Sequence, residues 1–195
     1  HKGSLESQLA QVHDGEIDVL AGLVPLQAQS LIEIGCGSAQ LARGLLQRWP
    51  QCQVTALEVD AVQHAKNLAN PQSGLKFVAA GAEALPFPEA AFDGALMLKS
   101  LHHVPMASMD AALAEVARVL RPGAFFYVSE PIYGGALNGL VRLYNDEGVV
   151  RPAAQAALDR ALASGVHWEA LAERRFAQPV HFTSFNDFAQ RMMYP

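Results

Sequence analysis

A chain of 195 residues, 51% of them hydrophobic and 17% charged, is long enough for one substantial core and too apolar to be disordered. Its formal net charge of −5 argues against a nucleic acid as the main partner, because a phosphate backbone binds basic surfaces. No stretch approaches the roughly 20 apolar residues of a membrane span, and Cys36 and Cys52 form neither a disulfide framework nor a zinc-ligand spacing. We therefore expect a cytoplasmic globular protein that holds no metal.

The chain begins with helical periodicity and continues with alternating strands and helices. Apolar residues recur at helical spacing from residue 5 to 24, with an interruption near Gly15, which favours one or two amphipathic helices. Short apolar runs then predict strands at 31–34, 53–57, 75–79, 92–98 and 124–129. Helices are predicted between them at 38–49, 60–70 and 108–120. This alternation indicates an α/β fold, a Rossmann-like, doubly wound, mainly parallel sheet with helices on both faces.

The character of the sequence changes after Pro131. Residues 136–164 have helical propensity but contain Gly148 and Pro152, and residues 182–193 predict one more amphipathic helix. We interpret the first segment as a helical insert after the fifth strand, in the position of a lid. The expected organisation is a single domain over residues 1–195, with N-terminal helices at 5–29, a core at 30–131, and the insert or lid and last helix at 132–195.

A glycine-rich loop follows the first predicted strand, in the sequence Leu-Ile-Glu-Ile-Gly-Cys-Gly-Ser-Ala. Gly35 and Gly37 allow a tight turn and let a ligand lie against bare backbone, beside the N-terminus of the next helix. The third glycine of a nicotinamide-binding fingerprint is replaced by Gln40. Glu33, inside the strand, is also foreign to that fingerprint and suits a ligand with a cationic amine.

An acidic residue ends the second predicted strand. Glu58 lies about 20 residues beyond the glycine loop, where a carboxylate can accept hydrogen bonds from both hydroxyls of a ribose. The alternative is a carboxylate that caps the next helix, a position that Asp60 also suits. Ribose binding does not distinguish a nicotinamide cofactor from S-adenosylmethionine, since both carry this sugar.

Five segments in register carry a family resemblance: EIGCGSA, VTALEVD, AEALPFPEAAFD, LMLKSLHHV and LAEVARVLRPGAFFYVSEP. Over residues 30–131 the chain resembles the class I S-adenosylmethionine-dependent methyltransferases, particularly the branch that includes ubiquinone and menaquinone biosynthesis methyltransferases. The resemblance implies S-adenosyl-L-methionine as the cofactor. It also implies transfer of a methyl group to an oxygen, nitrogen or carbon atom of a small organic molecule.

The resemblance implies a role for each matching position. Residues of the first strand and glycine loop surround the methionine end of the cofactor, the end of the second strand holds the ribose, the turn after the third strand contacts adenine, and the end of the fourth strand lies beside the transferring methyl. The implied cofactor-binding residues are Glu33, Gly35, Cys36, Gly37, Glu58, Val59, Gly81, Ala82, Glu83, Leu98 and Lys99.

Two departures from the family pattern affect these expectations. Gly81 stands where the family often has an aspartate that accepts a hydrogen bond from the adenine amino group. The fold normally ends with two further strands, which nothing after Met193 supplies. A truncated chain, a partly ordered chain or an edge completed by a neighbouring subunit in a homodimer would each account for these missing terminal strands, because open edges tend to pair.

His102 and His103 follow the fourth strand, on the side of an open α/β sheet where ligands bind. They are the candidates for a general base, which is needed only if the accepting atom carries a proton of high pKa. The alternative is that the pair only shapes the pocket. Polar residues of the insert could line an acceptor pocket, or lie on the surface of an ordinary helix: Tyr133, Asn138, Arg142 and Tyr144.

Two other functions stay open at this point. A binding or interaction module on the same scaffold, without catalysis, is suggested by Gly81 and by the missing terminal strands. A nucleotide-dependent oxidoreductase is a more distant alternative, because the glycine fingerprint is incomplete. Nucleic-acid methylation is disfavoured, since the chain has neither a motif of the N/D-P-P-Y type nor a basic tract with aromatic residues.

Overall fold

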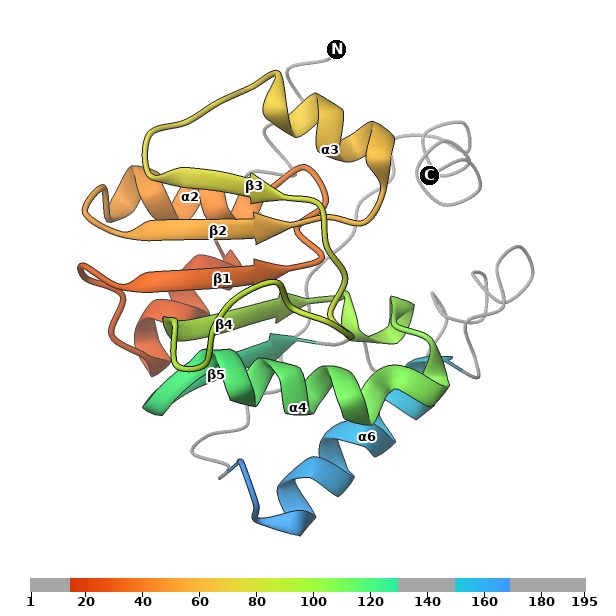
Figure 1. Ribbon diagram of the computed structural model, residues 1–195. Helices are drawn as coiled ribbons and strands as arrows, with labels where there is room; N and C mark the ends of the chain where they lie inside the picture. The colour runs from red at the N-terminus through yellow and green to blue at the C-terminus, as the bar shows by residue number, and fades with distance from the viewer. Residues whose placement is uncertain (1–14, 130–149, 169–195) are drawn as a thin grey trace, which may run out of the picture.

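The computed structural model describes residues 15–129 and 150–168, and these form a five-stranded sheet between layers of helices (Figure 1). The strands are β1 (Ser30–Ile34), β2 (Gln53–Leu57), β3 (Leu75–Val78), β4 (Phe92–Leu98) and β5 (Leu120–Ser129). They lie in the order β3-β2-β1-β4-β5, and every neighbouring pair is parallel. The predicted doubly wound α/β fold is confirmed, because the order reverses between β1 and β4.

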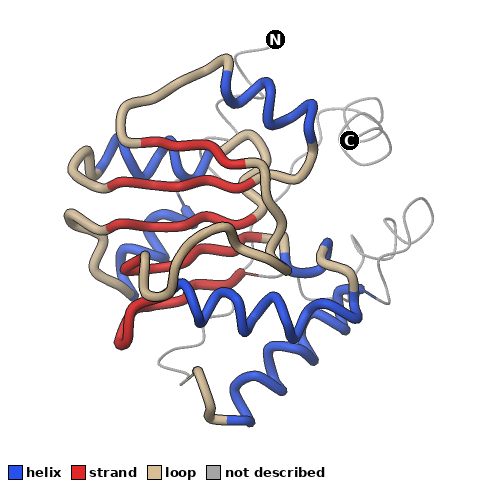
Figure 2. Tube along the Cα trace, viewed as in Figure 1, coloured by secondary structure: helices blue, strands red, loops and turns tan. Residues whose placement is uncertain are grey.

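Helices pack on both faces of this sheet. The helical segments are 15–23, α2 (Gln40–Arg48), α3 (Ala61–Leu68), α4 (Met109–Val119) and α6 (Val150–Ser164), with single 3₁₀ turns η1 (Leu101–His103) and η2 (Met106–Ser108). Helix 15–23 and α2 share one apolar cluster with the sheet, and α4 and α6 share another on the opposite face (Figures 1 and 2). The carboxyl ends of all five strands lie at the same edge of the sheet, as the arrows in Figure 1 show.

Strand β1 shows why its sequence is almost wholly apolar. Alternate side chains point to opposite faces, so Leu31 joins the cluster beneath helix 15–23 and α2, whereas Ile32 and Ile34 join the cluster beneath α4. Glu33 shares the face of Leu31 and is buried as well. Burial of a carboxyl group costs free energy that an apolar residue would not cost, so Glu33 is a candidate for a role in binding.

The structure differs from the expectations at two connections. Strand β5 begins at Leu120 rather than at residue 124, and its pairing with β4 is irregular between Phe92 and Gly94. Residues 121–123, which the sequence placed between a helix and a strand, are therefore part of an irregular strand, in which Gly123 has a φ of +78°. Helix α6 begins at Val150, so that Pro152 lies in its first turn, where a missing N–H breaks no helical hydrogen bond.

Helix α6 is the described part of the predicted insert, and it packs against the rest of the domain. Helix α6 contacts α4 and η1 on the same side of the sheet. The start of the expected insert, the helix at 182–193 and the question of terminal strands lie outside the described residues.

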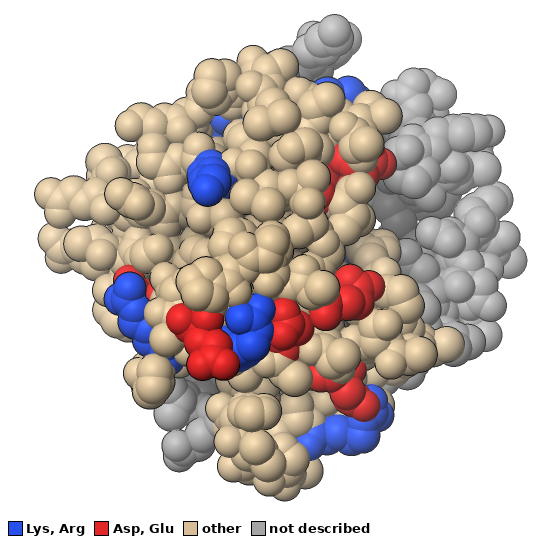
Figure 3. Space-filling view, viewed as in Figure 1, with Lys and Arg blue, Asp and Glu red and all other residues tan. Residues whose placement is uncertain are grey.

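Charged side chains on the face shown in Figure 3 lie intermixed, blue beside red, instead of forming one basic area. Opposite charges also pair directly, Arg118 with Glu115 on α4 and Arg121 with Asp93. Within residues 15–129 and 150–168, no helix combines the length and apolarity needed to cross a bilayer.

Candidate functional site

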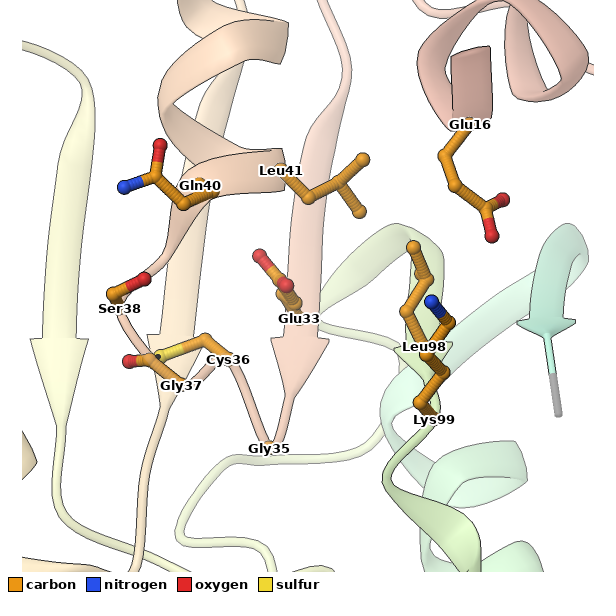
Figure 4. Close-up of a pocket in the computed structure, with 10 residues that line it drawn as sticks. All are labelled: Glu16, Glu33, Gly35, Cys36, Gly37, Ser38, Gln40, Leu41, Leu98 and Lys99. Atoms are coloured by element: carbon orange, nitrogen blue, oxygen red, sulfur yellow. Dashed lines mark hydrogen bonds between the residues drawn. The ribbon is translucent and has the colours of Figure 1, made fainter. Parts of the chain in front are cut away.

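A cleft of about 240 Å³ opens at the carboxyl ends of β1 and β4 (Figure 4). These strands are the neighbours between which the strand order reverses, and the connections that leave them diverge and leave room for a ligand. The cleft is lined by Glu16, Glu33, Gly35, Cys36, Gly37, Ser38, Gln40, Leu41, Leu98 and Lys99. Six of the predicted cofactor-binding residues are therefore brought together around one space.

Gly35 brings the loop after β1 against the loop after β4. Its φ is +72°, and a Cβ added to it would stand 2.5 Å from the Cβ of Ser100. The buried Ser100 hydroxyl donates a hydrogen bond of 2.8 Å to the carbonyl of Ile34. Only glycine allows both the backbone conformation and this approach, so the turn is shaped by packing as well as by the need for bare backbone.

Two side chains hold the second glycine of the loop in place. The Gly37 N–H donates to Glu58 Oε2 at 2.8 Å, and its carbonyl accepts from Asn67 Nδ2 at 2.8 Å. Asn67 is the buried residue of α3, on a helix whose other residues are partly or fully exposed. The glycine loop is thus preorganised by residues that lie 21 and 30 positions further along the chain.

Glu33 is the least satisfied polar group of the cleft. Its residue is only 4% exposed, and its buried Oε2 atom has no hydrogen-bond partner among the residues that the structure describes. Burial raises the pKa of this carboxyl from 4.5 to about 8, against a smaller lowering by a hydrogen bond from the backbone of Ala42. A buried acceptor without a donor is destabilising on its own, and a ligand that brings a cationic donor into the cleft would relieve it.

Glu58 lies next to this cleft and is held by backbone donors. Beside the bond from Gly37, its Oε1 accepts from the N–H groups of Val59 and Asp60, at 2.9 and 3.0 Å. Asp60 is the N-cap of α3, and its side chain accepts from the N–H of Gln63 at 2.9 Å. Helix capping therefore belongs to Asp60, as its sequence position suggests, and Glu58 is available at the strand end.

The residues expected around adenine also lie together. A Cβ added to Gly81 would stand 2.6 Å from Glu83 Oε2 and 3.3 Å from a methyl group of Val59. Ala82, which lies between Gly81 and Glu83 in the sequence, is buried, whereas Val59 is 73% exposed. The space where an aspartate at position 81 would begin is occupied by the carboxylate of Glu83.

The end of β4 contributes Leu98 and Lys99 to the cleft wall. Lys99 has a φ of +53°, and its N–H donates to the carbonyl of Ser129 at 2.7 Å, which ties the strand end to β5. His102 and His103 follow in η1, and His103 is not among the described residues that line the cleft. A role for either histidine as a base stays a prediction.

The two cysteines are both buried and free. Burial, together with the negative charges of Glu33 and Glu58, raises the pKa of the Cys36 thiol to about 12. Cys36 is therefore a neutral wall of the cleft at physiological pH and not a nucleophile. Among the residues that the structure describes, no three metal-ligating side chains come together.

Sequence reasoning missed four of the lining residues, Ser38, Gln40, Leu41 and Glu16, and of these Glu16 is the ionisable one. Helix 15–23 carries it into the cleft wall, where its residue is 2% exposed (Figure 4). The sequence did contain a sign of its burial. Glu16 lies four positions before the buried Leu20, a spacing that places both residues on the apolar face of the helix. For Ser100 and Asn67 the local sequence offers no comparable signal. Tyr133, Asn138, Arg142 and Tyr144 lie outside the described residues.

Comparisons with known proteins agree on the nature of this domain. Residues 32–128 match the family described as "Methyltransferase domain". A fatty-acid O-methyltransferase of Mycolicibacterium smegmatis is 34% identical over 112 residues, which cover 56% of this chain and 40% of that enzyme. The chain thus spans less than half the length of this relative.

Solved structures give the same fold. The [4+2]-cyclase SpnF is similar with a TM-score of 0.56 and 29% identity, over 63% of this chain and 46% of that one. A SAM-dependent methyltransferase from Aquifex aeolicus is similar with a TM-score of 0.54, over 70% of this chain and 77% of that one; at 16% identity it speaks for the fold alone.

Proposed function

Residues 32–128 of this chain form a class I S-adenosylmethionine-dependent methyltransferase domain, and from this premise we propose a function for the whole protein. The protein binds S-adenosyl-L-methionine and transfers its methyl group to a small organic molecule. Among oxygen, nitrogen and carbon, an oxygen atom is the favoured acceptor, because the relative from Mycolicibacterium smegmatis is named for O-methylation of fatty acids.

The unpartnered carboxylate oxygen of Glu33 is the observation that carries this proposal. It lies in a cleft at the reversal point of the sheet, beside a glycine loop that is already held open to a ligand. The ammonium group at the methionine end of the cofactor is the kind of donor that this buried oxygen lacks. The residues present therefore fit the cofactor.

The other predicted residues would hold the rest of that molecule. Gly35 and Gly37 leave room for it along the loop, Leu98 and Lys99 border its methionine end, and Glu58 accepts the hydroxyls of the ribose. Val59 and the turn at Gly81, Ala82 and Glu83 border the adenine. When bound, the cofactor supplies a methyl group that its sulfonium makes electrophilic.

The protein's own contribution to the transfer is position and exclusion of water. Alignment of an acceptor atom behind the methyl group can supply several kcal/mol, with upper estimates of about 7–11 kcal/mol. A carboxylic acid acceptor is already ionised near neutral pH and needs no base, whereas an alcohol does. We therefore expect substitution of His102 or His103 to slow the methylation of alcohols more than that of carboxylates.

The partners and location belong to the same proposal. A small molecule is favoured over a nucleic acid by the net charge of −5 and by the intermixed charges on the face in Figure 3. The two buried, unpaired thiols support the reducing environment of the cytoplasm. The single-domain organisation, with acceptor-binding residues in 132–195, and the homodimer stay predictions.

A module that binds the cofactor without methyl transfer is the second candidate. It is favoured by the similarity to SpnF, which is a cyclase by name, and by the glycine at position 81. A fold alone does not decide between these activities.

The test has two stages and uses the 195-residue chain. Isothermal titration with S-adenosylhomocysteine, the demethylated cofactor, should give micromolar or tighter binding, and no heat at high micromolar concentration with folded protein contradicts both candidates. Radiolabelled S-adenosylmethionine is then incubated with fatty acids, phenols and hydroxylated polyketides. Label in an organic product supports the methyltransferase, and binding with no transfer across the panel supports the non-catalytic module.

A further inference from the structure

The cleft contains a second buried carboxylate, Glu16, that none of the sequence motifs accounts for. It comes from helix 15–23, which precedes the residues matched by the methyltransferase family. Packing fixes this helix against α2 and the sheet. Ile17 and Leu20 are fully buried. Gly44 of α2 lets Ile17 approach closely, because a Cβ added to Gly44 would stand 2.7 Å from Ile17 Cδ1.

Two hydroxyl groups at the end of β5 orient the Glu16 carboxylate. Tyr127 Oη donates to Oε2 at 2.8 Å, and Ser129 Oγ donates to Oε1 at 3.1 Å. Burial and the hydrogen bond to Glu16 both raise the pKa of the Tyr127 phenol, so it remains a donor at physiological pH. Each carboxylate oxygen can accept more than one hydrogen bond, and acceptor positions of Glu16 therefore remain for a ligand.

The cleft wall carries two carboxyl groups that a bound cation would hold in their ionised form. Two carboxylates, Glu16 and Glu33, and one basic residue, Lys99, are among the ten lining residues. Glu16 on helix 15–23 and Glu33 on β1 both line this cleft, and in the view of Figure 4 Leu98 lies between them. The Glu33 Oε2 atom has no partner there, which indicates independently that the space receives a donor.

We propose that Glu16 is a further cofactor-binding residue, which together with Glu33 holds the ammonium group at the methionine end of the cofactor. This inference rests on the proposed function. It makes helix 15–23 part of the cofactor site and gives it a specific task, recognition of the amino-acid end of the ligand. Tyr127 and Ser129 act as positioning residues, because they orient Glu16 without lining the cleft themselves.

The experiment compares two ligands on the full 195-residue chain. S-adenosylhomocysteine carries the amino-acid end, whereas 5′-methylthioadenosine has the same adenosine and sulfur without it. We expect Glu16→Gln to weaken S-adenosylhomocysteine binding by about 10- to 100-fold, as for loss of a charged hydrogen bond, and to change methylthioadenosine binding less than about twofold. Asp18→Asn is the matched control, since Asp18 lies on the same helix in an exposed ion pair with Arg48. It should change neither affinity.

The outcomes separate this inference from the proposed function. If Glu16→Gln weakens both ligands equally, or weakens neither, the carboxylate only ties the helix to β5 and the inference is wrong. If the wild-type protein binds neither ligand, the proposed function fails with it. Thermal unfolding checks that each variant is folded. Should Glu16→Gln not fold, Glu16→Asp keeps the charge on a shorter side chain and must lose affinity for S-adenosylhomocysteine selectively.

Discussion

The two ends of the proposed cofactor site use the same residue type in opposite ways. At the inner end, defined by Glu16 and Glu33, the carboxylates are buried, and Glu33 has an oxygen with no partner. At the outer end, defined by Glu58, Val59 and Glu83, the carboxylate of Glu58 accepts three backbone N–H bonds and Val59 is 73% exposed. One end is completed only by a ligand, whereas the other is complete without one.

This difference indicates how the site divides its work. A desolvated, unpaired carboxyl group is costly to ionise until a cation arrives. We therefore expect the inner end to discriminate strongly between ligands that bring a cationic donor and those that do not. A carboxylate that is already satisfied keeps the loop in shape and gains little from exchanging one donor for another. We therefore expect the inner end to dominate specificity and the outer end to dominate preorganisation.

The largest expected effect is a pH dependence of stability that originates at the inner end. The pKa of Glu33 is about 8 in the folded protein and 4.5 as its ordinary value, so the folded state binds more protons between these pH values. The unfolding free energy of the ligand-free protein should fall as pH rises from about 4.5 to 8, by at most about 5 kcal/mol. Glu33→Gln should remove most of this slope. Urea denaturation at pH 5 and pH 8.5 measures it, and equal slopes in both proteins would refute the comparison.

Next in size is the loss of ligand binding in the same variant. Glu33→Gln removes the carboxyl group that would ionise against the ligand's ammonium, so affinity for S-adenosylhomocysteine at pH 7 should fall by about 10- to 100-fold. Affinity for 5′-methylthioadenosine should stay within about twofold of wild type. Isothermal titration provides both numbers. An unchanged affinity for S-adenosylhomocysteine would mean that Glu33 serves the fold and not the ligand.

A smaller effect is expected at the outer end. Glu58→Gln places an amide N–H₂ against backbone donors, so it should cost about 1–2 kcal/mol of unfolding free energy and weaken both ligands by about tenfold. The exposed Glu89, on the loop before β4, offers Glu89→Gln as a control for loss of one negative charge. Selective loss of S-adenosylhomocysteine alone in Glu58→Gln would contradict the division between the two ends.

The smallest effect is expected for Val59→Ala. Because Val59 is largely exposed, the unfolding free energy should change by less than about 0.5 kcal/mol. Loss of apolar contact with adenine should weaken both ligands about threefold, as expected for roughly one buried methylene. Identical affinities in wild type and variant would show that adenine does not pack on this side chain.

Much of the fold could be predicted from the sequence, because the patterns that indicate strands and helices are local in the chain. Apolar runs bounded by glycine and proline predicted all five strands, four of them to within one residue, and the parallel order follows from their alternation with helices. The exception is β5, whose start at Leu120 depends on pairing with β4 across an irregular register. Pro122 and Gly123 are poor strand formers, so nothing in the local sequence indicates that the strand extends through them.

By itself the sequence determined three elements of the site: a two-glycine loop after a buried strand, a carboxylate within that strand and another carboxylate at the end of the next strand. These features follow from conformational freedom and burial, which depend on neighbours in the chain. Tertiary structure alone decided that Glu16 enters the cleft, that Ser100 closes on Gly35 and that Asn67 and Glu58 fasten Gly37. The reason is physical: hydrogen bonds and close packing join residues distant in sequence, and no local periodicity records which partners meet.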